Sequence, residues 1–108
     1  MAYYLLQVAY APEAWAALVK NPQNRIEAVR PAVEKLGGKI QGAWFAFGEY
    51  DIVTIFEMPD NASAAAISIA FTAGGAVKAI KTTPLMTVEE GIEAMRKAGG
   101  TGYRPPGG

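Results

Sequence analysis

Hydrophobic and polar positions divide the chain into segments with two different repeats. Four segments are rich in β-branched and aromatic residues, have few polar interruptions and end near proline or glycine, so each predicts a strand: residues 3–10, 39–47, 50–58 and 76–86. The first is so uniformly apolar that we expect it to be buried on both faces or nearly so. The fourth is expected to be interrupted or ended near Pro84, because proline cannot donate to a strand ladder.

Helical spacing marks the segments between these strands. Residues 12–19 predict a short helix, and a second helix is expected from Pro22, with Asn21 as its N-cap, to the Gly37-Gly38 pair. Its apolar face recurs through Pro31, where a kink is expected because proline removes one backbone hydrogen bond. Asp60 is a good N-cap for an alanine-rich helix over residues 61–73.

A last helix is predicted to begin at Thr87, which forms a capping box with Glu90. Its apolar residues recur at helical spacing and are expected to face inward: Val88, Ile92, Met95 and Ala98. The order of elements is therefore β-α-β-β-α-β plus a C-terminal helix, which predicts an α+β, ferredoxin-like, four-stranded antiparallel sheet with its helices on one face. We expect one domain over residues 1–98 and a flexible Gly/Pro-rich tail over 99–108.

The stretch FAFGEYDIV, residues 45–53, joins the second and third predicted strands. Glycine at position 48 suits the first central position of a two-residue type II′ turn, which pairs Phe47 with Tyr50. In that register both faces of the hairpin are largely apolar, so a second chain is expected to cover the face away from the helices. Tyr50 and Asp51 are adjacent in the predicted strand and are expected to point to opposite faces.

Composition removes several classes of chemistry. The 108 residues include ten basic and ten acidic side chains, so no net charge favours nucleic acid or an anionic membrane as a partner. The absence of histidine and cysteine excludes disulfides, His/Cys metal sites, and the triads and pairs that depend on them. We expect neither a metal nor a cofactor. No stretch approaches the ~20 apolar residues of a membrane span, and the start lacks a signal peptide's basic region, so we expect a cytoplasmic location.

The hairpin and its flanks also carry a family resemblance. The stretch FGEYDIVTIFEMPD, together with NRIEAVRPAVEKLGGKIQGAWFAF before it and AVKAIKTTPLMTVEE after it, resembles the GYD domain family, which is named for a Gly, a Tyr and an Asp at this hairpin. The motif maps onto Gly48, Tyr50 and Asp51, with Glu49 interposed. The resemblance implies a ferredoxin-like fold and homo-oligomers of the dimeric α+β barrel kind, and it implies no particular reaction. Pro31 and the tail from Gly99 depart from the family pattern.

The leading functional hypothesis is a homo-oligomer that binds a small, partly apolar molecule between helices and sheet or between subunits. The candidate ligand-binding residues lie at or near the hairpin: Trp44, Phe47, Tyr50 and Asp51. A structural role remains open for each of them, as core, interface anchor or turn cap. Four cations could neutralise an anionic ligand: Arg25, Arg30, Lys78 and Lys81. For the two lysines the favoured alternative is that they are exposed charges that protect an edge strand from aggregation.

Two alternatives belong to other functional classes. The first is a cofactor-free enzyme, such as an oxygenase, isomerase or decarboxylase, which the resemblance of fold suggests. Its candidate titratable groups are Tyr50, Asp51 and Glu57, and no catalytic residue is assigned among them. The second is a structural or adaptor oligomer that uses its C-terminal tail to engage partners.

Overall fold

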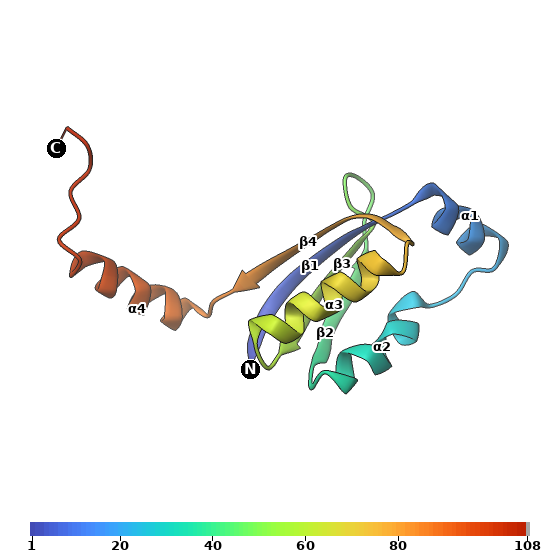
Figure 1. The fold of residues 1–108 in the computed structure, drawn as a ribbon, viewed down its shortest axis with the longest axis horizontal. Coiled ribbons are helices and arrows are strands. Elements are labelled where there is room, and N and C mark those ends of the chain that lie inside the picture. Colours follow the sequence, from blue (N-terminus) through green and yellow to red (C-terminus); the bar gives the residue numbers. More distant parts are fainter. Residues whose placement is uncertain (108) are drawn as a thin grey trace.

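Four strands form one antiparallel sheet in the order β2-β3-β1-β4, and two helices cross one face of it (Figure 1). The structure is a computed structural model that describes residues 1–107. Its elements are β1 (Ala2–Tyr10), α1 (Pro12–Lys20), α2 (Arg25–Lys35), β2 (Lys39–Phe45), β3 (Ile52–Met58), α3 (Asn61–Ala73), β4 (Val77–Leu85) and α4 (Val88–Gly99).

The sheet has the connectivity of a ferredoxin-like fold. β1 is central and pairs antiparallel with both β3 and β4, while β2 and β4 form the two edges. Helix α2 follows β1 and leads to β2, and α3 connects β3 to β4, so the two crossovers place these helices on the same face. The predicted fold class is confirmed, with the short helix α1 as an addition to the first crossover.

The hydrophobic core lies between the sheet and these two helices. Even-numbered residues of β1 and β3 point to the helices because side chains alternate along a strand. Nine apolar side chains form the buried cluster: Tyr4, Leu6, Val8, Val33, Ile52, Phe56, Met58, Ala64 and Ile67. Gly37 ends α2 with a φ of 83°, and a Cβ on Gly38 would collide with the Met58 sulfur, so this Gly-Gly pair also lets α2 pass closely over β3.

The opposite face of the sheet carries no helix and is also apolar over its centre. Residues Leu5, Val53 and Ile55 are only partly buried there, and the Trp44 ring lies over Gly42 with 58% of its surface exposed. We call this surface the open sheet face. Its apolar character follows the hairpin pattern in the sequence, and coverage by a second chain stays a prediction.

The hairpin between β2 and β3 is longer than predicted. The predicted register is confirmed where Phe45 pairs with Ile52, but the ladder stops there, so the expected pairing of Phe47 with Tyr50 is wrong. The Ala46 amide donates to the Asp51 carbonyl at 2.8 Å, which leaves residues 47–50 as a loop. Gly48 has a φ of 157°, whereas the first central residue of a type II′ turn needs about 60°. The strand extension is lost because Asp51 directs its amide and carboxylate to β1.

One predicted boundary shifts and another is confirmed. Asn24, rather than Asn21, caps α2, because its side-chain oxygen accepts hydrogen bonds from the amides of Ile26 at 3.0 Å and Glu27 at 3.2 Å. Asn21 instead ends α1, where its amide donates to the Ala17 carbonyl. Strand β4 includes Pro84, which an edge strand tolerates, and ends one residue later at Leu85, so the predicted end near Pro84 is confirmed.

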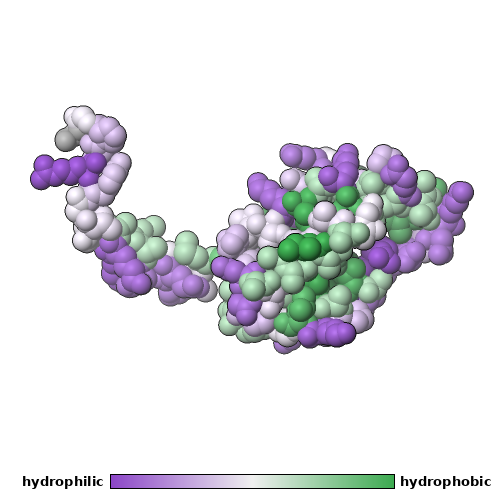
Figure 2. Space-filling model, viewed as in Figure 1, coloured by the Kyte–Doolittle hydropathy of each residue, from purple (hydrophilic) through white to green (hydrophobic). Residues whose placement is uncertain are grey.

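The C-terminal helix α4 extends away from the sheet, so the prediction that its apolar residues face inward is wrong (Figure 1). None of residues 88–99 is buried, and Val88 and Met95 are about three-quarters exposed at 76% and 73%. The predicted capping box of Thr87 and Glu90 is present. Only residues 86 and 87 separate α4 from β4, and the inner face of the sheet is already covered by α2 and α3. Helix α4 presents apolar residues along one side and polar residues along the other (Figure 2).

Candidate functional site

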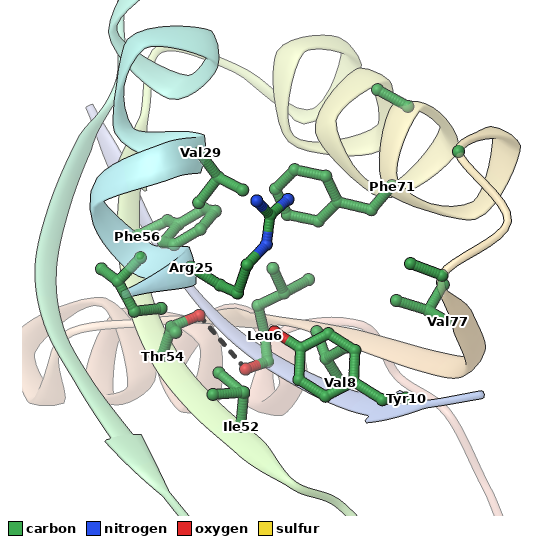
Figure 3. A pocket seen from close by; sticks show the side chains of 14 residues that line it. Leu6, Val8, Tyr10, Arg25, Val29, Ile52, Thr54, Phe56, Phe71 and Val77 are labelled. Atoms are coloured by element: carbon green, nitrogen blue, oxygen red, sulfur yellow. Dashed lines mark hydrogen bonds between the residues drawn. The ribbon is translucent and has the colours of Figure 1, made fainter. Parts of the chain in front are cut away.

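A cavity of about 240 Å³ opens between the sheet and the two helices that cover it. Hydrophobic residues are exposed on this face of the molecule in the region between α2 and α3 (Figure 2). Most of the lining is apolar and comes from β1, β3, α2, α3 and the start of β4, with Val8, Val29, Ile52, Phe56, Phe71 and Val77 as the main contributors (Figure 3). The volume lies just below the range of about 300–1,000 Å³ typical of ligand pockets, so the space suits a small molecule.

Three side chains in the cavity wall carry polar atoms. The Thr54 hydroxyl is buried and donates to the Leu6 carbonyl at 3.2 Å, so it is already satisfied. The Arg25 guanidinium projects from the first turn of α2, and the Tyr10 hydroxyl approaches from the end of β1 (Figure 3). Within residues 1–107 the Tyr10 hydroxyl makes no hydrogen bond, and Arg25 makes one, from Nη1 to the Gln23 side-chain oxygen at 3.2 Å. These two groups are therefore available to a molecule in the cavity.

The electrostatic surroundings keep Tyr10 protonated. Burial raises the pKa of the Tyr10 hydroxyl above its ordinary value of 10.0, the positive charge of Arg25 lowers it, and the negative charge of Asp51 raises it, with a net increase. A phenol with a raised pKa is neutral near pH 7. Tyr10 can thus donate a hydrogen bond, and it is a poor general base.

Asp51 holds the end of β1 and helix α1 against the hairpin loop. One carboxylate oxygen, Oδ2, accepts hydrogen bonds from the Tyr10 amide at 2.9 Å and from the Trp15 indole nitrogen at 3.3 Å. The Trp15 ring meets the Tyr10 ring edge-on, with centroids 5.4 Å apart and planes at 82°. Asp51 thus positions Tyr10, and through it one wall of the cavity, from outside the cavity.

The other residues predicted for the site lie elsewhere. Trp44 is on the open sheet face, and Phe47 is fully exposed at the tip of the hairpin loop. Tyr50 is partly buried in the same loop and makes no side-chain hydrogen bond to another of residues 1–107. A larger and more open depression of about 730 Å³ beside the β2 edge includes Trp44 together with Phe45 and Arg30. The structure therefore brings none of Trp44, Phe47, Tyr50 and Asp51 into the wall of the cavity.

A family model fits most of this chain. The GYD domain model matches residues 4–95, from β1 into α4. The chain belongs to the GYD domain family. A comparison with curated proteins gives no match.

The three residues that the sequence analysis matched to the GYD motif lie together at the loop between β2 and β3, and Asp51 is the one that bonds to other elements. Gly48 and Tyr50 lie in the loop between β2 and β3, and Asp51 joins that loop to β1. Tyr50 and Asp51 precede β3, so the prediction that they are neighbours in a regular strand is wrong. The motif thus stands beside the cavity without lining it.

Sequence reasoning missed Tyr10 as a residue of the cavity. A usable signal was present, because Tyr10 has the same parity as the core residues Tyr4, Leu6 and Val8 and ends the strand at the open end of the core. Among residues 1–107 no group of three or more aspartate or glutamate residues is placed to hold a metal ion. No helix within the same residues is long and apolar enough to cross a membrane.

Proposed function

We propose that this GYD domain protein is a homo-oligomer that binds a small molecule in the cavity between the sheet and helices α2 and α3. The observation that carries the proposal is an apolar cavity into which two polar groups project without a strong partner in the protein, Arg25 and the Tyr10 hydroxyl. Ligand pockets combine an apolar lining with a few such groups, which fix the orientation of the bound molecule.

Binding is favoured over catalysis by the positions of the titratable groups. The two candidate carboxylates have protein partners, since Asp51 accepts from β1 and α1, and Glu57 accepts from the Gln41 side chain at 2.6 Å on the other face of the sheet. The titratable groups in the cavity wall are Tyr10 and Arg25. A neutral phenol and a guanidinium bind and orient a molecule well, and neither is suited to removing a proton near pH 7.

The open sheet face supports the homo-oligomer part of the proposal, with a second copy of the chain as the occupant. Its centre is apolar and continuous across three strands through Leu5, Ile55 and Trp44. The same face carries charges of both signs, Glu57 on β3 and the lysines Lys39 and Lys81 on the edge strands. A surface that is apolar at its centre and has both signs of charge around it can pair with a copy of itself about a two-fold axis.

The binding proposal is tested by titrating ¹⁵N-labelled protein with a panel of small metabolites and following amide resonances. We expect each metabolite that binds to shift the amide resonances of cavity residues such as Val8 and Phe71. Val29→Phe adds a ring to the cavity wall and should abolish these shifts, whereas Val19→Phe, on the exposed surface of α1, should leave them unchanged. Resonance shifts that are confined to the open sheet face, or that persist in Val29→Phe, would contradict the assignment of the site.

The assembly proposal is tested by measuring mass in solution with light scattering. The wild type should have a multiple of the monomer mass. Val53→Glu places a charge at the centre of the open sheet face and should give a monomer, while Val19→Glu on α1 should not. A monomeric wild type would reject this part of the proposal. The cytoplasmic location expected from the sequence remains a prediction, which cell fractionation would check.

A further inference from the structure

The two arginines in the first half of α2 differ in what they bind. The guanidinium of Arg30 makes two hydrogen bonds to the Glu27 carboxylate, at 3.0 Å and 3.2 Å, and this ion pair lies at the surface of the protein. Arg25 has no carboxylate within 4.0 Å among residues 1–107, and its hydrogen bond to Gln23 is to a neutral oxygen. Glu27, the acid of this helix nearest to Arg25 in sequence, thus binds Arg30, and most of the five guanidinium donors of Arg25 have no partner among residues 1–107.

Arg25 is also the only charged residue among those that line the cavity within the part of the chain described, residues 1–107. No aspartate, glutamate or lysine on α2, α3, β1, β3 or β4 contributes to the wall, and Asp51, whose charge acts on Tyr10, accepts hydrogen bonds from the Tyr10 amide and Trp15. A partly buried cation beside apolar side chains is stabilised by an anion that brings its own apolar body into the space.

The Tyr10 hydroxyl supplies a second donor on the facing side. Tyr10 projects from β1 and Arg25 from α2, and both line the cavity, with the guanidinium drawn by Val29 and Phe71 and the Tyr10 hydroxyl by Leu6 (Figure 3). A carboxylate has two acceptor oxygens, so one oxygen can accept from the guanidinium and the other from the phenol. The raised pKa of Tyr10 keeps that phenol protonated, and hence a donor.

We infer that the cavity selects a small organic monoanion, a carboxylate with an apolar body, whose head group is bound by Arg25 and Tyr10 and whose body lies against the apolar wall. This inference rests on the proposed function and adds the chemical class of the ligand. An ammonium ligand is disfavoured because its charge would be repelled by Arg25. A neutral ligand of the same shape would accept weaker hydrogen bonds from Arg25 and Tyr10 and would leave the guanidinium without its counter-charge.

The experiment uses three probes of similar size that differ in the head group: phenylacetate, 2-phenylethanol and 2-phenylethylamine. Their dissociation constants are measured with the full-length protein by calorimetry at pH 7, and amide shifts locate each probe. Phenylacetate should bind about 10- to 100-fold more tightly than 2-phenylethanol, as expected for charge-assisted hydrogen bonds to one head group. 2-Phenylethylamine should bind most weakly.

Variants assign the preference to named groups. Arg25→Gln should reduce the ratio of phenylacetate to 2-phenylethanol affinity to about one, whereas Arg25→Lys should retain part of it because the charge remains. Tyr10→Phe should lower phenylacetate affinity several-fold and leave 2-phenylethylamine unchanged. Arg96→Gln, on the exposed surface of α4, is the matched control and should preserve the wild-type ratio. Circular dichroism spectra that match the wild type would show that each variant is folded.

The outcomes separate the ligand class from the binding function. If all three probes shift the cavity amides with equal affinity, or the amine binds best, the anion inference is rejected while the cavity remains a binding site. If phenylacetate is preferred but the preference survives Arg25→Gln, another group recognises the anion and the inference is also rejected. If no probe shifts the cavity amides, both the inference and the proposed function fail.

Discussion

Replacement of Asp51 by alanine tests whether this residue of the GYD motif acts as a structural connection. The substitution removes the acceptor of the Tyr10 amide at 2.9 Å and of the Trp15 indole at 3.3 Å. A hydrogen bond to a charged group contributes about 1.5–3 kcal/mol, and the lower half of that range applies here because the carboxylate is only partly buried. The longer, exposed bond to Trp15 adds at most about 0.5 kcal/mol.

We therefore expect Asp51→Ala to lower the free energy of unfolding by about 2 kcal/mol. Asp51→Asn should lower it by about 1 kcal/mol, since the amide oxygen can still accept one bond without the charge. With a urea slope of about 2 kcal/mol/M, the alanine variant should unfold at a midpoint about 1 M lower. Urea titrations followed by circular dichroism at one fixed protein concentration measure this shift and hold any contribution from assembly constant.

Glu49→Ala is the control, because Glu49 lies in the same loop, is exposed and makes no hydrogen bond to the rest of residues 1–107. Its free energy of unfolding should stay within about 0.5 kcal/mol of the wild-type value. The indole N–H resonance of Trp15 should move in both Asp51 variants and stay in place in Glu49→Ala. Equal stability of Asp51→Ala and Glu49→Ala would refute the structural role derived from the two hydrogen bonds.

Three further outcomes are expected. Tyr50→Phe should change the free energy of unfolding by less than about 0.5 kcal/mol in the same urea titration, because the Tyr50 hydroxyl has no hydrogen-bond partner within residues 1–107. A loss of stability as large as that of Asp51→Ala would contradict this prediction. The Ser63 amide and side chain lower the pKa of Asp60 below its ordinary 3.8, so the stability that this cap contributes is present above pH 3.8 and is lost as the pH falls through the folded-state pKa. Asp60→Asn caps the helix without titrating, so this variant should lose less stability than the wild type on acidification. Thermal unfolding at a series of pH values measures the difference. Removal of residues 88–108 should leave the melting temperature within a few degrees of the wild-type value, because none of residues 88–99 is buried. If the same truncation lowers the mass of the assembly in solution, α4 takes part in subunit contacts.

The sequence allowed the order of elements and the fold class to be predicted because each strand and helix has a strong repeat of its own. It also predicted the register of β2 against β3 from Ala43 to Phe45, but it did not predict the irregularity between Ile40 and Gly42, where the register shifts. The hairpin loop was mispredicted because the bonds that end the strands come from β1, which is distant in sequence: the Tyr10 amide and the Val8 carbonyl both bind Asp51.

The cavity could be anticipated as a class of site between helices and sheet, but its residues could not. Arg25 is recognised as a candidate for the site only once the structure shows that Glu27 binds Arg30. Tyr10 is recognised only once the structure shows that α2 and α3 leave its hydroxyl uncovered. The α4 prediction failed for a similar reason. An amphipathic helix indicates that some apolar partner exists, and the repeat carries no information on whether that partner belongs to the same chain.

The position of Asp51 has a consequence for comparing GYD domains with one another. A sequence motif whose acid is bound to a main-chain amide and an indole marks a way of building the hairpin, and it constrains the cavity wall only through the placement of Tyr10. Under the proposed function, domains can keep the motif while exchanging the side chains at positions 10 and 25, and with them the ligand that the cavity would bind. Transfer of a ligand assignment between two such domains should require agreement at those two positions in addition to the shared motif.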